Sequence, residues 1–173
     1  YAYCVGSDFG RMLEALPRLD PSVIVVIPSV IERCFDALER HYRGAQTQSL
    51  AKIIYVGEPP GKQMRTSLES AFGVEVYGYY GASETSALGI ECRAHDGIHL
   101  PIDRNLIEMT VYDASATTGE IVVTTLRQQT LPLLRYALRD VIEVKAGVCP
   151  CGLSHPRVEV KGRAVDSSPI ATR

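Results

Sequence analysis

The sequence lacks a long run of apolar residues. Its longest stretch, Val23–Ile27, has five residues, whereas a helix needs roughly 20 to span a bilayer. The first residues also show no secretory signal, which would require a longer apolar segment behind a basic one. These absences argue against a transmembrane helix, so the expectation is a soluble, cytoplasmic protein.

The sequence also lacks an excess of charge of one sign. Lysine and arginine number 18 against 20 aspartates and glutamates, which leaves a net charge of −2. Such a chain has no general electrostatic attraction to nucleic acid or to acidic membrane surfaces, so neither is an expected partner. We find no internal repeat and no low-complexity segment.

The composition is that of a globular protein, with 46% apolar and 22% charged residues. A chain of 173 residues can bury roughly 70% of its unfolded surface and needs no disulfides to fold. Its five cysteines are expected to be free thiols or metal ligands in a reducing cytoplasm. Because the chain opens on Tyr1 and stops soon after a Gly-Arg turn, both ends are expected to be cuts through a larger protein.

The first half alternates predicted helices with predicted strands. The runs at 22–28, 52–57 and 74–80 are apolar on both faces and too short for helices. Ser7 and Asp8 can cap a helix through about Leu16, which Pro17 ends, and "SVIE" at 29–32 forms a capping box for a second helix. Pro60 suits the first turn of a third helix. Strands of this kind, separated by helices, predict an α/β fold with a parallel sheet.

The second half changes character after about Asp96. Short alternating strands are predicted at 106–113, 119–126, 133–138, 140–147 and 157–163, with Gly, Pro, Asp and Thr turns between them. This pattern is typical of an antiparallel sheet or a distorted barrel. We expect an α/β subdomain over residues 1–96 and a smaller β-rich subdomain over residues 97–161.

Two glycine-containing turns directly follow predicted parallel strands. They are "GEPP" at 57–60 and "YGASE" at 80–84, and each carries a glutamate. In open parallel sheets, ligands bind in the crevice outside the carboxyl ends of the strands, and glycine lets a ligand approach the backbone. The alternative is two ordinary strand-to-helix turns with solvated acids.

The motif "YGASE" resembles the Tyr-Gly-x-Ser/Thr-Glu motif of the adenylate-forming enzymes, which include acyl-CoA synthetases. The segments "ECRAHDGIHLPID", "TGEIVVTTL", "LPLLRYALRD" and "KGRAVD" follow in the order found in the phenylacetate–CoA ligase branch. The resemblance runs from about Gly57 to Asp166. It implies a central fragment of such an enzyme, with nucleotide binding in residues 1–96. It also implies a hinge at Asp166, and with it the start of a further domain over residues 162–173.

The resemblance also implies roles for single residues. Tyr80 would lie against the adenine ring, and Asp140 would accept hydrogen bonds from the ribose hydroxyls, which suits an acceptor-only carboxylate. Glu84 would hold a magnesium ion, because hard cations prefer carboxylate oxygen. Arg163 would reach the ribose or phosphate and is, with Glu84, a candidate catalytic residue. The remaining nucleotide-binding candidates are Gly57, Glu58, Pro59, Gly81 and Ser83.

Each of these residues also has a purely structural interpretation. Asp140 could terminate a strand, Arg163 could be a surface charge in a turn, and Arg135 could pair with a nearby acid. The acid substrate is expected to contact Tyr79, Gly81, Ala82 and residues near Ala87.

Three cysteines and one histidine suggest a metal site. Cys149 and Cys151 form a C-x-C pair, and Cys92 and His99 lie in "ECRAHDGIH". Three thiolates and an imidazole are the donor set of a closed, structural zinc site. Some members of the branch carry the same pattern, in which His99 fits better than His95, the reserve ligand. The alternative is that the cysteines are small buried residues.

The resemblance implies an ATP-dependent ligase that converts a carboxylic acid, with an aryl acid favoured, to an acyl adenylate and then to a thioester of coenzyme A. Acyl transfer to a protein thiol and a non-catalytic, zinc-stapled scaffold are the alternatives. The family's Ser/Thr/Gly-rich phosphate loop and its lysine-bearing C-terminal domain have no counterpart in these residues. The isolated chain is therefore expected to be a poor catalyst.

Overall fold

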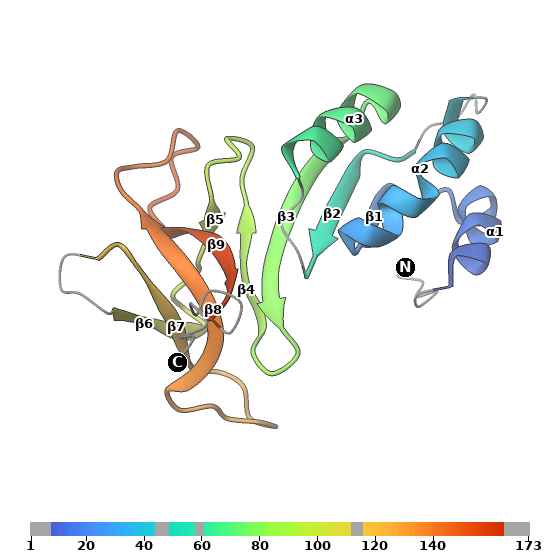
Figure 1. The fold of residues 1–173 in the computed structure, drawn as a ribbon. Coiled ribbons are helices and arrows are strands. Elements are labelled where there is room, and N and C mark those ends of the chain that lie inside the picture. The colour runs from blue at the N-terminus through green and yellow to red at the C-terminus, as the bar shows by residue number, and fades with distance from the viewer. Residues whose placement is uncertain (1–7, 44–48, 58–60, 112–115, 165–173) are drawn as a thin grey trace, which may run out of the picture. The chain divides into compact units, whose positions relative to one another are not determined.

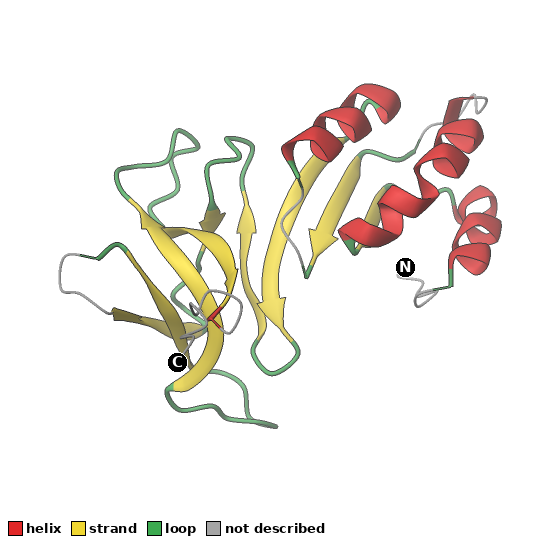
Figure 2. Ribbon diagram, viewed as in Figure 1, coloured by secondary structure: helices red, strands yellow, loops and turns green. Residues whose placement is uncertain are grey.

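The computed structural model describes residues 8–43, 49–57, 61–111 and 116–164. The chain divides into two compact units, Tyr1–Tyr79 and Tyr80–Arg173 (Figure 1). The three helices belong to the first unit, and strands dominate the second (Figure 2). Among the described residues, none of the helices combines the length and apolarity that crossing a membrane requires.

The first unit alternates helices and strands as the sequence predicts. Its elements are α1 (Phe9–Leu19), β1 (Val23–Val26), α2 (Pro28–Arg43), β2 (Lys52–Val56), α3 (Lys62–Phe72) and β3 (Glu75–Ala82), whose last residues belong to the second unit. β2 pairs in parallel with both β1 and β3. The predicted α/β fold with a parallel sheet is confirmed.

All three helices contribute to one apolar cluster on one face of this sheet. Leu16, Leu38 and Leu68 come from α1, α2 and α3 and pack with alternating strand residues such as Ile53 and Tyr55. On the other face, within this unit, Val23 and Val25 of β1 are 41% and 63% exposed. Parallel sheets are usually covered on both faces, so this face of the unit carries unusual apolar exposure.

The ends of two helices differ from prediction. Asp8 caps α1 by accepting a hydrogen bond from the Arg11 amide, but the helix continues past Pro17 to Leu19. A proline within the last turn removes one amide donor without preventing the Asp20 amide from bonding to the Leu16 carbonyl.

The second helix, α2, begins at Pro28, so Ser29 lies within its first turn and the predicted capping box is wrong. Proline is favoured at the first helical position because its missing amide needs no partner there. Pro60 lies outside the described residues.

The second unit is an antiparallel sheet without helices among its described elements. Its strands are β4 (Ser86–Glu91), β5 (Ile98–His99), β6 (Asn105–Val111), β7 (Thr118–Thr125), β8 (Tyr136–Lys145) and β9 (Arg157–Arg163). Their order is β4-β5-β9-β8-β7-β6, and each neighbouring pair in this order is antiparallel.

The strand order of this unit leaves the sheet open, so it is not a closed barrel. The two end strands nevertheless approach each other, because the Asn105 side chain donates to the Ala87 carbonyl at 3.4 Å. The segments 133–138 and 140–147 do not form two strands: one strand, β8, starts at Tyr136. β4 and β5 were not predicted.

The division of the chain into compact units falls between Tyr79 and Tyr80, and β4 pairs with β5 within the second unit. The expected subdomain boundary after residue 96 stays a prediction. The second unit has its own core, which includes Leu88, Ile121, Val123, Ile142 and Val158. The hinge expected in residues 162–173 lies largely outside the described residues, and the subdomain limits of the parent protein stay predictions.

Candidate functional site

Two strand irregularities place Asp140 and Arg163 opposite each other. These two residues are direct partners across β8 and β9, next to a register shift that inserts one extra residue in β9. Beside it, Gly162 has φ 125°, which favours glycine. On the other side of β8, the pairing with β7 also shifts near Asp140, and Arg139 has φ 67°. Bulges of this kind re-aim side chains and are common near active sites.

Asp140 is the centre of a three-residue hydrogen-bonded group. The Tyr80 hydroxyl donates to Asp140 Oδ2 at 2.8 Å, and Arg163 Nε lies 3.0 Å from Oδ1. Arg163 Nη1 also donates to the Leu138 carbonyl at 2.9 Å. Tyr80 and Asp140 are both buried, while the Arg163 side chain is 57% exposed. The structure therefore brings together three predicted nucleotide-binding residues from β3, β8 and β9.

The electrostatics of this group keep the Tyr80 hydroxyl protonated. Burial, and then the negative charge of Asp140, raise the pKa of Tyr80 well above its ordinary value. The hydroxyl is consequently a hydrogen-bond donor at any physiological pH. Asp140 still has free acceptor capacity, because its two oxygens offer about four lone-pair sites and only one contact to each oxygen is described.

Glu84 lies in the turn between β3 and β4, together with the exposed Ser83. Glu84 is half-buried, and its main-chain carbonyl accepts a hydrogen bond from Gln128 Nε2 at 3.1 Å. Gly81 and Ala82 end β3. The magnesium-binding role of Glu84 stays a prediction, as do the roles of Gly81 and Ser83.

The remaining predicted residues are one glycine, one arginine with a structural ion pair, and three residues that the structure does not describe. Gly57 follows β2 with φ 91°, a conformation that favours glycine. Arg135 has the structural role that was considered for it, since its Nε lies 3.2 Å from Glu108 Oε2. Glu58, Pro59 and Asp166 lie outside the described residues.

Cys92, His99, Cys149 and Cys151 form one cluster. Their four ligand atoms all lie within 4.8 Å of one another. Cys92 Sγ is 3.5 Å from Cys149 Sγ, and Cys151 Sγ is 3.5 Å from His99 Nε2. Zinc–sulfur and zinc–nitrogen bonds of about 2.3 and 2.0 Å at tetrahedral angles separate donors by roughly 3.5–3.8 Å. Two of the donor separations therefore match those of a tetrahedral zinc site, and the other donors lie close enough to complete one.

The protonation preferences of His99 and Cys149 suit metal ligands, whereas that of Cys92 opposes its thiolate form. Burial lowers the pKa of His99, and the nearby Arg157 charge lowers it further, so Nε2 keeps a lone pair near neutral pH. A hydrogen bond from the Cys151 backbone is the main cause that lowers the pKa of Cys149. Burial raises the pKa of Cys92, whose thiol therefore holds its proton more firmly until a metal displaces it.

The choice between the two histidines follows the geometry. His95 is outside the cluster, and its Nδ1 lies 3.5 Å from Glu91 Oε2. His99 is 2% exposed and points to the sulfur atoms. One contributor was missed: Arg157, which is 4% exposed and bonded to the loops that carry the three cysteines. An arginine that opens an alternating strand gives no sequence signal for that role.

Comparison with known proteins agrees with this arrangement. The model of the family described as AMP-binding enzyme matches residues 4–127. The chain belongs to the AMP-binding enzyme family. Its sequence is 28% identical over 165 residues to a phenylacetate-coenzyme A ligase of Thermus thermophilus, a match that covers 90% of this chain and 37% of the relative. A phenylacetate-coenzyme A ligase of Escherichia coli is 29% identical over 151 residues, with 82% and 35% covered.

These matches confirm the resemblance to the phenylacetate–CoA ligase branch of the adenylate-forming enzymes. The chain spans about a third of the length of those curated relatives. Its fold matches a 2-hydroxyisobutyryl-CoA ligase in complex with 2-HIB-AMP (TM-score 0.73, 22% identity), covering 95% of this chain and 37% of that one. An anthranilate CoA ligase in complex with anthranoyl-AMP also matches (TM-score 0.67, 12% identity, 95% and 34% covered).

Proposed function

We propose that this chain is the central, nucleotide-binding part of an AMP-forming carboxylic acid–CoA ligase. The observation that carries the proposal is the hydrogen-bonded group of Tyr80, Asp140 and Arg163 in a chain of this family. Three residues that are 23 to 83 positions apart in the sequence meet at one carboxylate, and each has a role that suits an adenosine phosphate.

The two bonds to Asp140 orient its carboxylate for a diol. Tyr80 and Arg163 each occupy one oxygen, and the remaining lone pairs accept hydrogen bonds from the two ribose hydroxyls. The Tyr80 ring offers a flat face to the adenine, while its hydroxyl stays bonded to Asp140. The half-exposed Arg163 guanidinium places positive charge close to the ribose and phosphates, where it stabilises developing negative charge.

Glu84 is the proposed magnesium ligand of this site. Its carboxylate offers the oxygen that a hard cation prefers. When bound, the ion supplies charge neutralisation at the ATP phosphates. The turn that carries Glu84 is anchored from the second unit's own residues, because Gln128 donates to its main-chain carbonyl.

The proposed substrate is an aryl carboxylic acid, and coenzyme A is the proposed acceptor thiol. The support is the name of the curated relatives, phenylacetate-coenzyme A ligase. Gly81, Ala82 and Ala87 are the candidate pocket residues in the second unit. ATP, AMP and coenzyme A are thus the proposed ligands of the parent protein, and the isolated chain is expected to lack acid-dependent ATP–pyrophosphate exchange.

The four-donor cluster is the proposed structural zinc site. Cys92, His99, Cys149 and Cys151 would supply all four donors of a zinc ion and would leave no open position for substrate, as in closed structural sites. Zinc would link the loop after β4 to the loop between β8 and β9, which carry the four donors together with β5. Metal analysis of the protein purified without chelators should give one zinc per chain, and Cys151→Ser should lower that ratio.

Isothermal titration with AMP and with ATP tests the nucleotide site. Asp140→Ala should weaken AMP binding about 10–100-fold, since hydrogen bonds to a charged group contribute about 1.5–3 kcal/mol. Glu84→Gln should mainly reduce the gain in ATP affinity that magnesium gives. Asp36→Ala, an exposed aspartate of α2, is the matched control and should bind AMP like the unaltered chain.

The same titration separates a ligase part from a non-catalytic scaffold. A scaffold shows no saturable AMP binding, or shows binding that Asp140→Ala leaves unchanged, and either result contradicts the proposal. The zinc measurement is independent of this outcome, because a scaffold can hold the metal as well.

A further inference from the structure

Arg157 is the most buried charged side chain outside the nucleotide site among the described residues. It is 4% exposed and opens β9. An arginine keeps its proton in proteins, and a buried charge needs partners to offset the loss of hydration. Its contacts therefore show what this charge does in the fold.

The guanidinium of Arg157 joins two loops that are distant in the sequence. Nη1 donates to the Asp96 carbonyl at 3.1 Å and forms an ion pair with the Asp96 carboxylate. Nη2 donates to the carbonyls of Ala146 and Gly147, both at 3.1 Å. The planar fork of the guanidinium makes both sets of contacts at once, which a lysine ammonium could not match in geometry.

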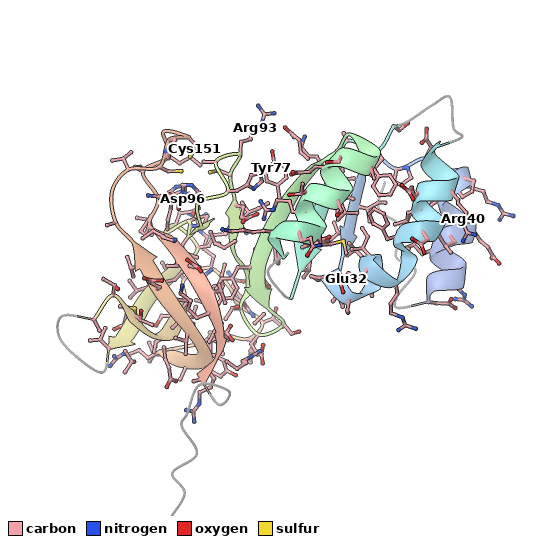
Figure 3. The ribbon with its side chains drawn as sticks, turned by 45° about the horizontal axis from the view of Figure 1, so that its top comes forward. Glu32, Arg40, Tyr77, Arg93, Asp96 and Cys151 are labelled. Carbon is pink, nitrogen blue, oxygen red and sulfur yellow. The ribbon has the colours of Figure 1, made fainter. Side chains whose placement is uncertain are left out.

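These two loops carry three of the four donors of the metal cluster, and the fourth, His99, follows the first loop on β5. Asp96 lies between Cys92 and His99, while Ala146 and Gly147 lie just before Cys149. His99 is also the direct partner of Arg157 across β5 and β9, so the two side chains leave the sheet on the same face. Figure 3 shows Asp96 and Cys151 at the same end of the second unit.

Charge gives a second reason for an arginine here. Three thiolates and a neutral imidazole around Zn²⁺ leave a net charge of −1 on the site. A buried guanidinium beside the cluster offsets this charge where water cannot. The pairing of Arg157 with His99, one of the four donors, across β5 and β9 agrees with that proximity.

We propose that Arg157 is a positioning residue of the four-donor site, which fixes the two ligand-bearing loops and supplies the positive charge that offsets the bound metal–thiolate centre. This inference rests on the proposed zinc site. It assigns a role to a residue that touches neither the metal nor a nucleotide. The partners outside the ligand shell usually change metal affinity 10–100-fold when they are lost.

Competition with a chromophoric zinc chelator measures this contribution. Arg157→Gln should weaken zinc binding about 10–100-fold and speed zinc release. Arg157→Lys keeps the charge but not the fork, so its affinity should lie between those of Arg157→Gln and the unaltered chain. Substitution with Co²⁺ gives a spectroscopic readout: the thiolate charge-transfer bands should weaken or broaden in Arg157→Gln.

Val123→Ala is the matched control for general destabilisation. Val123 is 0% exposed and lies in the core of the same unit on β7, so its truncation lowers stability without touching either loop. It should leave zinc affinity within about twofold of the unaltered chain, which is far less than the change expected for loss of an outer-shell partner. If Arg157→Gln fails to fold, the zinc affinities of Arg157→Lys and Asp96→Asn in the same competition assay test the role of Arg157.

The outcomes distinguish this inference from the proposed metal site. Zinc binding in Arg157→Gln, or in both Arg157→Lys and Asp96→Asn, equal to that of the unaltered chain overturns the role of Arg157 alone. An unaltered chain that binds no zinc overturns the metal site, and the role of Arg157 with it. Zinc affinity that falls from the unaltered chain to Arg157→Lys to Arg157→Gln, and that stays unchanged in Val123→Ala, supports both the metal site and the role of Arg157.

Discussion

Tyr55 and Tyr80 are both buried, but their hydroxyl groups have different surroundings. The Tyr55 hydroxyl has no hydrogen-bond partner among the described residues, and its ring is 0% exposed in the core of the first unit. Burial raises the pKa of Tyr55 to about 12. The Tyr80 hydroxyl, in contrast, donates to Asp140 at 2.8 Å. A buried polar group without a partner destabilises the fold, whereas a bond to a carboxylate stabilises it.

The two tyrosines therefore predict opposite effects of the same substitution. Tyr55→Phe should raise the free energy of unfolding by about 1 kcal/mol, and Tyr80→Phe should lower it by about 1–2 kcal/mol. Urea denaturation, with the midpoints compared at constant m, measures both. A loss of stability in Tyr55→Phe would mean that its hydroxyl has a partner after all.

Gly162 is a second position at which adding a single carbon atom, the Cβ of alanine, should change stability. Its φ of 125° is one that side chains rarely adopt, and a Cβ there would meet no atom within 4 Å. Gly162→Ala should therefore cost about 1–3 kcal/mol through backbone strain and not through a clash. AMP binding should weaken as well, because the bulge orients Arg163 towards Asp140.

Lys161→Ala is the control for Gly162→Ala. It alters an exposed neighbour in the same strand, whose ion pairs contribute at most about 1 kcal/mol. Thermal or urea denaturation compares the two variants, and equal losses in both would argue against the strained backbone as the cause.

At the scale of elements, β8 and β9 are joined by a ladder of charges as well as by backbone bonds. Glu143 and Glu159 are direct partners across the two strands, and such like charges would repel. Two lysines offset this repulsion by forming ion pairs. Lys145 lies 2.9 Å from Glu159. Lys161 lies 2.9 Å from Glu159 and 2.7 Å from Glu143. Hydrogen bonds from Lys145 and Lys161 lower the pKa of Glu159 from 4.5 to about 2.

This ladder predicts how stability depends on pH. The folded-state pKa of Glu159 lies below its unfolded value, so the ionised form stabilises the fold above about pH 4.5. That contribution disappears as the pH falls towards about 2. Because the Glu159 side chain is 46% exposed, the effect should be modest and should shrink in high salt.

Measurement of unfolding midpoints between pH 6 and pH 2 tests the ladder. Glu159→Gln should remove part of the acid-dependent loss, and carboxyl NMR titration should give Glu159 a midpoint near 2. A Glu159 midpoint at its ordinary value of 4.5 would contradict the two lysine contacts.

At the scale of the whole molecule, the described residues form two apolar cores. Leu68 and Val76 belong to the cluster of the first unit, and Ile121 and Val158 belong to that of the second. The proposed zinc site lies entirely in the second unit. Metal removal should therefore loosen one unit first, since local stability follows local contacts.

Hydrogen exchange with and without a chelator tests this expectation. Amides in residues 92–99 and 146–156 should exchange faster without zinc, because both loops lose their link, whereas those of β2 and α3 should change little. Cys151→Ser should reproduce the effect without a chelator. Equal acceleration in both units would contradict a local structural role for the metal.

The sequence by itself determined the element types and the candidate residues. Apolar runs such as Val23–Ile27 predicted parallel strands because their composition leaves no polar face for water. Motif order identified Tyr80 and Asp140, and residue chemistry identified the four metal donors. The sequence-based prediction was wrong about the end of α1 and the start of α2. Helix ends depend on individual hydrogen bonds, and a local sequence pattern does not reveal their partners.

Only the tertiary structure decided which of these residues meet. The bond from Tyr80 to Asp140 spans 60 positions, and it depends on bulges whose register no alternating pattern encodes. The role of Arg157 follows only from its hydrogen bonds to residues distant in the sequence, Asp96 and Gly147. Local sequence sets backbone preference and side-chain chemistry, whereas strand order and register set the distances between them, and a binding site is defined by those distances.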